Sequence, residues 1–238
     1  TKFAGQTGFT GLCRYSVTTG LVDTTWKPAL GLAGTQIGVT RFEFSSDESK
    51  IYLVFAGANS NYLLRSVNVS DATVTSIAIL NGSNLNQVAL QVDSTHIYCG
   101  GTFTTVTPQG GNSTARNYIC RFNVSDNTLD SWYPTINNSV NEMRLDNDYV
   151  YAAGAFTTVG GVTHSRLVKL NKSNGAVASD WNANSNTGAD IRSLLIGSDN
   201  NLYMWGPTNW NGAALSGAGY LVKCSKTGVR DTNFSSGT

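Results

Sequence analysis

The chain has 238 residues, of which 40% are hydrophobic and only 13% are charged, and its formal net charge is +1. With no run of Lys or Arg and no apolar stretch near the ~18 residues of a transmembrane helix, nothing points to nucleic acid, an anionic membrane surface or membrane insertion. Gly, Asn, Ser and Thr abound while helix-favouring residues are scarce, which predicts a turn-rich all-β protein with a core of its own.

Four kinds of strand-like run appear in the first part of the chain. It begins with "TKFAGQTG" and no initiator Met, so we interpret it as a mature or excised piece of a longer product. The run "CRYSV" carries one basic residue, and the run after the next turn, "TTGLVDTTW", ends in Trp26. The alternating run "GVTRFEFSS" then passes through a turn at Asp47 into "KIYLVF", which contains Tyr52.

These runs recur along the rest of the chain at intervals of about 50 residues. The tyrosine run is repeated at Tyr52, Tyr98, Tyr151 and Tyr203. The basic run places one cation in each unit, at Arg14, Arg65, Arg121, Lys169 and Lys223. The third run supplies one bulky apolar residue per unit, at Trp26, Ile77, Trp132, Trp181 and Phe234, which we expect to be packing residues.

The turn before each tyrosine run carries an aspartate. Asp47, Asp93, Asp146 and Asp199 stand beside Asn, Ser or Gly, which is the chemistry of a hairpin turn. A calcium loop would need spaced acidic ligands and a closing Glu, and the "DND" at 146–148 has neither. We therefore predict no metal site.

Four short strands per unit without a helical stretch predict a β-propeller, with a stacked β-solenoid as the competing fold. We expect a single domain over 1–238 with about five four-stranded blades. Its repeat units run approximately over 1–49, 50–95, 96–148, 149–200 and 201–238. Only four alternating inner runs accompany five basic runs, so one blade is expected to lack its inner strand within this chain and to expose an edge that attracts partners.

Two of the units carry a longer shared motif. "YVYAAGAFTTVGGVTHSRLVKLNKSNGAVASDW" and the looser "HIYCGGTFTTVTPQGGNSTARNYICRFNVSDNTLDSW" resemble the delta-60 type propeller repeat family and its pattern "GG.FT.VGG...R..RLN..G..D..F". The resemblance covers residues 96–200 and extends to the first and last units, whereas 50–95 replaces the motif by "AGANSNYLL". It implies a secreted or surface protein of bacteria or a phage tail or fibre protein, and it carries over no catalytic residues.

The recurrence of the charged residues indicates a structural role rather than a catalytic one. We expect the five basic residues to be satisfied by turn carbonyls or by Asp23, Asp130, Asp180 and Asp231. On the inner runs, Glu43 and Glu142 have the residue type of a paired-carboxylate glycosidase, but they also suit a channel lining neutralised by Arg41, Arg144 and Arg192. No nucleophile, zinc or phosphate-loop motif is present, so we predict no enzyme and no cofactor.

Two other residue types have structural interpretations. The four cysteines show no CxxC pairing and are expected to be buried thiols on strands. The two histidines, His96 and His164, are expected to be solvated loop residues.

Departures from the repeat are the best candidates for function, because the fold does not require them. Trp205 and Trp210, with Asn209 and Asn211 beside them, and Phe55 and Tyr62 fall where other units have different residues. Exposed aromatic rings next to amides suit stacking on a sugar, so we predict a ligand site there. The alternative is local repacking where the FTTV motif is missing.

Together these features predict a non-enzymatic extracellular binding or adhesion module that recognises glycans or a surface receptor through loops on one propeller face. The first alternative is a structural subunit of a fibre, filament or virion, with neighbouring subunits completing the deficient blade. The second is a glycoside hydrolase. The expected location is secreted, on the cell surface or in a virion.

Overall fold

The computed structural model describes residues 11–31, 39–57, 61–82, 88–183, 190–206 and 221–234, together with the backbone of four two-residue strands and the side chain of Trp210. Every strand pair in this part of the chain is antiparallel. The described residues contain strands, turns and bends and no helix, so none of them forms a helix that could cross a membrane. The predicted all-β class is confirmed.

Four sheets contain the tyrosine runs. Sheet I begins with β3 (Val39–Phe44), β4 (Lys50–Ala56), β5 (Asn61–Asn68) and β6 (Val74–Gly82). Sheet II consists of β7 (Val88–Val92), β8 (His96–Gly101) and β11 (Ile119–Asn123). Sheet III consists of β12 (Val140–Leu145), β13 (Tyr149–Gly154) and β16 (Leu167–Asn171). Sheet IV consists of β17 (Ser193–Ile196), β18 (Leu202–Trp205) and β21 (Leu221–Cys224).

The third predicted run, which carries the bulky apolar residue, is a full strand only in sheet I among the described residues, where it is β6. In sheets II, III and IV it joins the sheet through one isolated bridge, at Leu129, Val177 and Arg230 respectively. Each sheet starts at its inner strand, so the sheets begin about ten residues before the sequence units do. The sheets and the sequence units therefore begin at different runs of the repeat, while the order of the runs along the chain is as predicted.

The remaining short strands form hairpins. They are β1 (Lys2–Phe3) with β2 (Gln6–Thr7), β14 (Thr158–Val159) with β15 (Val162–Thr163), and β19 (Asn209–Trp210) with β20 (Ala213–Ala214).

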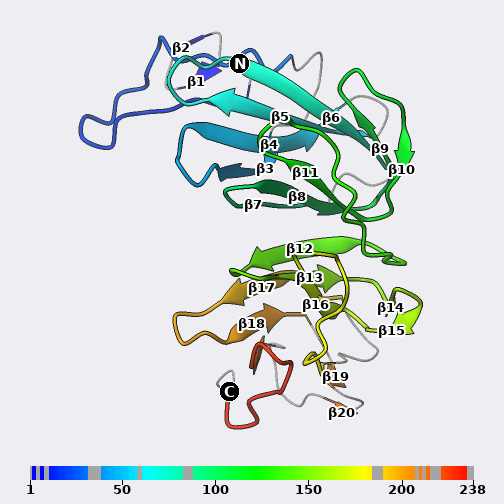
Figure 1. Ribbon diagram of the computed structural model, residues 1–238. Helices are drawn as coiled ribbons and strands as arrows, with labels where there is room; N and C mark the ends of the chain where they lie inside the picture. Colours follow the sequence, from blue (N-terminus) through cyan, green and yellow to red (C-terminus); the bar gives the residue numbers. More distant parts are fainter. Residues whose placement is uncertain are drawn as a thin grey trace.

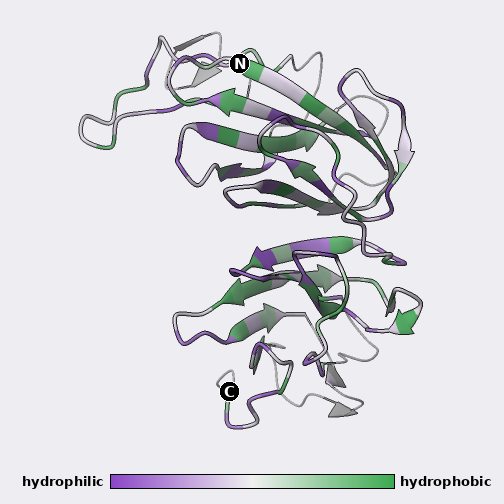
Figure 2. Ribbon diagram, viewed as in Figure 1, coloured by the Kyte–Doolittle hydropathy of each residue, from purple (hydrophilic) through white to green (hydrophobic). Residues whose placement is uncertain are grey.

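The sheets follow one another in chain order, as Figure 1 shows from the blue N-terminal part at the top to the orange sheet IV at the bottom. The inner strands make this row: β7 contacts β3 on one side and β12 on the other, and β12 also contacts β17. Apolar residues fill the spaces between sheets, and Figure 2 shows them along the strands of the stacked sheets. Successive antiparallel sheets packed face to face in this way are typical of a propeller-type repeat.

A glycine marks how closely two sheets approach. A Cβ added to Gly100 on β8 would lie 2.8 Å from Cγ1 of Val140 on β12. No side chain fits there, so sheets II and III can pack this tightly only because the position is glycine.

The FTTV motif differs in role between its two copies. In sheet III's unit it forms the small β14–β15 hairpin. In sheet II's unit it begins β9 (Phe103–Pro108), which pairs with β6 and with β10 (Thr114–Ala115) and so extends sheet I to six strands. One sheet thus contains strands from two repeat units.

Residues 11–31, which we call the N-terminal segment, contribute to the first interface of the row. Trp26 and Leu30 are buried in one cluster with Ile51, Leu53 and Phe55 of sheet I. Arg14 Nη1 donates to the Val69 carbonyl at 2.5 Å and so fixes the segment to the same sheet. The segment holds a single β-bridge, between Tyr15 and Val22.

Candidate functional site

The recurring basic residues are structural, as expected. Arg121 contacts Asp130 at 2.7 Å and Lys169 contacts Asp180 at 2.7 Å, and both cations are nearly buried. Arg14 and Lys223 make the same contact with Asp23 and Asp231, at 2.8 and 3.4 Å. Arg65 instead donates to the Leu30 carbonyl. Four of these cations thus pair with an aspartate of their own unit, and Arg65 contacts the N-terminal segment, so all five already have partners within the fold.

The turn aspartates make a second recurring network that the sequence analysis had not paired. The hydroxyls of Tyr98, Tyr151 and Tyr203 donate to Asp93, Asp146 and Asp199 at 3.3, 2.9 and 2.9 Å. The sequence contains a signal of this network, because the aspartate precedes the tyrosine by four or five residues in each unit.

Lysines of the following sheet reach two of these aspartates. Lys172 contacts Asp93 at 2.9 Å and Lys226 contacts Asp146 at 3.0 Å. A groove of about 710 Å³ lies beside the first pair. Because Lys172 and Asp93 neutralise each other, this groove is poorly suited to bind a charged ligand.

The expectations for the cysteines and for the histidines can be compared with the structure directly. Cys99, Cys120 and Cys224 are buried thiols as predicted, whereas Cys13 is only half-buried. The expectation of a solvated loop residue is wrong for His96, which is half-buried and begins the strand β8. Its Nδ1 lies 2.7 Å from the Thr95 hydroxyl, and burial lowers its pKa. His164 is half-buried too, again with its pKa lowered by burial.

Polar side chains on the inner strands form a connected cluster. Gln91 Nε2 on β7 donates to Glu43 Oε1 on β3 at 3.1 Å, and Arg144 contacts Glu142 on β12 at 2.7 Å. Burial raises the pKa of Glu43; the Arg144 cation opposes this shift and the Glu142 carboxylate adds to it. The alternating inner runs therefore bring these groups to one side, with Arg144 neutralising Glu142 as in the channel-lining interpretation.

The aromatic residues predicted to hold a ligand are mostly in the core. Phe55 and Tyr62 are 0% exposed and Trp210 is 4% exposed. The expectation that these rings are exposed is wrong, because β4 and β5 are covered on both faces and Trp210 packs in the cluster of sheets III and IV. A buried ring cannot present its face to a sugar, so local repacking explains these three departures.

Trp205 is the exception among the predicted aromatics, with 46% of its surface exposed. It lies on β18 opposite Ser193 and Leu221. The side chain of Asn209 and the whole of Asn211 lie outside the described residues.

A second groove, of about 670 Å³, lies where the β9–β10 hairpin meets β6 and the turn at 125–129. Its lining combines amides, hydroxyls, one ion of each sign and apolar residues, namely Gln109, Asn112, Asn127, Ser76, Thr114, Thr128, Arg116, Asp126, Ile77, Pro108 and Leu129. Sequence reasoning missed this site. Its only local signal was length: Phe103 precedes Arg121 by 18 positions, whereas Phe156 precedes Lys169 by 13.

Within this groove Arg116 is held by the fold. Its guanidinium lies 4.8 Å from the centre of the Tyr133 ring, and Nη2 donates to the Asp130 carbonyl at 3.3 Å. With Asp126 also in the lining, the groove has no excess charge of either sign. Its exposed hydrogen-bonding groups are amides and hydroxyls, among them Gln109 and Asn112.

Comparison with known proteins and families gives one match, to a family model. A search of curated proteins found no match to the chain. A family model described as "Domain of unknown function (DUF5122) beta-propeller" matches residues 150–177, which hold most of β13 and all of β14, β15 and β16. The match and the row of antiparallel sheets support a β-propeller-type repeat.

Proposed function

We propose that this chain is a non-catalytic extracellular binding module, built as a propeller of about five blades, that recognises a glycan in the groove beside the β9–β10 hairpin. A secreted, cell-surface or virion protein is the proposed setting, in line with the resemblance of the repeat. The groove between β6, the hairpin and the turn at 125–129 is the observation that carries the proposal.

The chemistry of the groove favours a neutral, polyhydroxylated ligand. Amides and hydroxyls can each donate and accept hydrogen bonds, as a sugar's hydroxyls require. Ile77 and Leu129 give an apolar floor for the C–H face of a sugar ring. The volume of about 670 Å³ falls in the range of ligand pockets.

The hairpin also has the position that a recognition element needs. It is the longer of the two FTTV loops, and β9 is anchored by pairing with β6, so the groove has one rigid wall. Asn81 Nδ2 adds hydrogen bonds to the hydroxyls of Thr105 and Thr107, at 3.1 Å each. Binding residues are commonly found on loops held by such a scaffold.

A glycan array followed by calorimetry tests this function. We expect Gln109→Ala and Asn112→Ala each to weaken binding by about 3- to 10-fold, the effect of one lost hydrogen bond. Asn147→Ala, which removes an exposed amide from the other groove, is the matched control. We leave Asn127 unchanged because its φ is +60°, which a substitution would strain.

Two further variants separate the proposal from other sites. If Trp205→Ala abolishes glycan binding while the groove variants leave it unchanged, the site lies on β18 instead. If Glu43→Gln with Glu142→Gln abolishes a hydrolytic activity on bound glycans, the module is an enzyme. Failure of the wild-type chain to bind any glycan would refute the function itself.

A further inference from the structure

Two cysteines lie directly opposite each other in sheet II. The register of the antiparallel pair β8–β11 places Cys99 beside Cys120. Side chains that stand opposite each other on neighbouring antiparallel strands share one face of the sheet. Both cysteines belong to the core cluster shared by sheets I and II, where each is 0% exposed. The two thiols are therefore neighbours inside the fold.

The backbone of the pair has the spacing that a disulfide bond needs. The Gly101 N–H donates to the Tyr118 carbonyl at 3.0 Å, two positions along the same register from the cysteines. Because hydrogen-bonded and non-hydrogen-bonded pairs alternate along antiparallel strands, Cys99 and Cys120 form a hydrogen-bonded pair with a Cα–Cα separation of about 5.5 Å. Disulfide bonds join Cα atoms about 4.4–6.8 Å apart. The strands therefore allow the bond without a change of register.

The repeat does not require cysteine at these positions. The equivalent pairs are Ala152 with Val168 in sheet III and Met204 with Val222 in sheet IV, so apolar side chains serve the packing there. Sheet II is also the sheet whose strands are joined by the longer FTTV loop, which holds β9 and β10. The cysteine pair stands at the two ends of this loop.

The state of the thiols indicates when a bond between them forms. Burial raises the pKa of the Cys120 thiol, and a hydrogen bond with the Cys99 thiol raises it further. The thiolate is the form that attacks a disulfide, so the packed sheet keeps Cys120 unreactive. The reaction therefore belongs to the stage of folding at which β8 and β11 have paired and sheet I does not yet cover them.

We propose that Cys99 and Cys120 form a disulfide bond across β8 and β11 when the protein folds in an oxidising environment, and that this bond fixes the base of the β9–β10 loop. The bond holds one side of the groove in place whatever ligand the groove binds, so the proposal does not depend on glycan recognition.

The oxidant is a small-molecule disulfide such as oxidised glutathione. One cysteine thiolate attacks the S–S bond of the oxidant, forms a mixed disulfide and releases one thiolate. The second cysteine thiolate attacks the protein sulfur of the mixed disulfide, forms the bond between Cys99 and Cys120 and releases the other thiolate. The protein sulfurs lose two electrons to the oxidant, and the two protons of the cysteines end on the two released thiols.

Oxidative refolding followed by peptide mapping tests the proposal. The reduced, denatured chain is refolded in a mixture of reduced and oxidised glutathione, its free thiols are alkylated in urea, and the unreduced digest is analysed by mass spectrometry. We expect one linked pair of peptides that contains Cys99 and Cys120, with Cys13 and Cys224 linked to neither. Recovery of Cys99 and Cys120 as alkylated thiols, or linked to other cysteines, would overturn the proposal.

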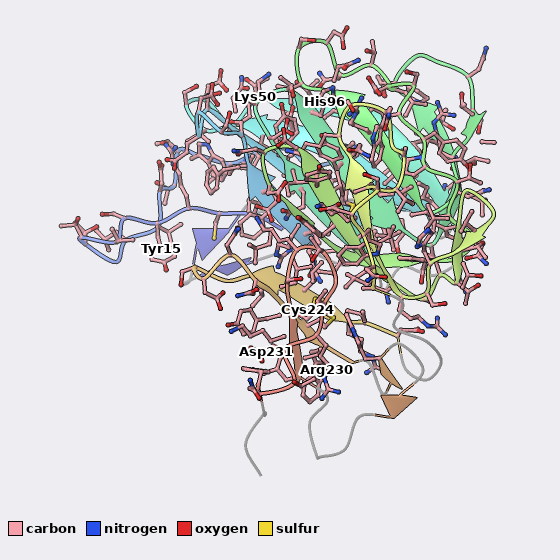
Figure 3. All side chains as sticks on the ribbon, turned by 60° about the horizontal axis from the view of Figure 1, so that its bottom comes forward. Tyr15, Lys50, His96, Cys224, Arg230 and Asp231 are labelled. Atoms are coloured by element: carbon pink, nitrogen blue, oxygen red, sulfur yellow. The ribbon has the colours of Figure 1, made fainter. Side chains whose placement is uncertain are left out.

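Cys224→Ala is the matched control, because Cys224 is a buried strand cysteine whose partners on neighbouring strands are Leu202 and Arg230. It belongs to another core cluster, and Figure 3 shows it well apart from His96, the first residue of β8. This variant is expected to form the bond as the wild type does. Cys99→Ala is expected to leave Cys120 as a thiol.

A comparison of the oxidised and reduced wild type needs no variant to fold. Because the bond restricts the unfolded chain, we expect the thermal midpoint of the oxidised protein to lie about 5–10 °C above that of the reduced protein. The midpoint of Cys99→Ala is expected not to respond to reductant. The same midpoint for the oxidised and reduced wild type would overturn the role of the bond in fixing the loop.

Discussion

At the scale of single residues, Asp93 shows how one side chain serves both a turn and an interface. Its Oδ1 accepts from the backbone N–H groups of Thr95 and His96, at 2.9 and 2.8 Å. Its Oδ2 accepts from Tyr98 and from Lys172 of the next sheet. Burial raises the pKa of this carboxyl, but the Thr95 N–H and Lys172 outweigh burial and lower the pKa to about 2.

The depressed pKa predicts a pH-dependent contribution to stability. The Asp93 carboxylate stabilises the fold fully above about pH 4, the unfolded pKa, and its contribution is lost as the pH falls through about 2. Asp93→Asn is therefore expected to lower the free energy of unfolding at pH 6, and the difference from wild type should shrink at pH 2. Urea unfolding at both pH values measures it.

Lys172→Met is the companion variant, because it removes the ion pair and leaves the turn intact. Its loss of stability is expected to shrink with falling pH in the same way. A destabilisation by Asp93→Asn that is equal at pH 6 and pH 2 would show that the charge has no role.

At the scale of elements, the sequence predicted what depends on local pattern. The tyrosine and basic runs became paired strands, such as β13 with β16, because apolar alternation and turn residues are set within a few positions. The pairing of β9 with β6 could not be predicted, since FTTV is the same in both copies and its partner lies in another unit.

The candidate site residues, too, could be predicted only where their position depends on the local sequence pattern. The polar cluster of Glu43, Gln91 and Glu142 came from period-two alternation, which the sequence displays. The burial of Phe55 and Tyr62 came from covering by neighbouring sheets, which the sequence does not display. A departure from a repeat shows that a position is not fixed by the common motif, but it does not show that the side chain is exposed.

The close approach of β8 to β12 gives a prediction for these elements. Gly100→Ala places a methyl group 2.8 Å from Val140 Cγ1 and 3.2 Å from the Ala89 Cβ, so we expect a loss of about 1–3 kcal/mol in the free energy of unfolding. Adding Val140→Ala should recover part of the loss, so that the double variant loses less than the sum.

Gly111→Ala is the control in the same unit. Its added Cβ would lie 3.5 Å from Pro108, an ordinary contact, and we expect a change within about 0.5 kcal/mol. Equal effects at Gly100 and Gly111 would mean that the close approach of the two sheets does not limit this position.

At the scale of the whole molecule, stability should vary along the row. Each sheet contacts mainly its neighbours, so a sheet covered on both faces is held by two interfaces and a sheet covered on one face by one. Leu195, Trp205 and Leu221 of sheet IV are exposed, whereas β8 and β13 are buried throughout most of their length.

Amide hydrogen exchange measures this gradient. We expect β8 and β13 to exchange most slowly and β18 and β21 to exchange faster, because opening sheet IV breaks a single interface. Uniform protection of all four sheets would show that the row unfolds as one cooperative unit.

The six-stranded sheet decides where the chain can be divided for separate study. Because β9 of one repeat unit is hydrogen-bonded to β6 of the unit before it, a cut between these units would strip an edge from sheet I and leave β9 without a partner. Between sheets II and III the two sides share side-chain packing and ion pairs, and the sheet pairings place no strand across the border. A two-part dissection of this molecule should therefore be made within residues 130–135, after the bridge of Leu129 to Phe122 and before the bridge of Ile136 to Val159, which keeps both partners of every sheet and bridge on the same fragment.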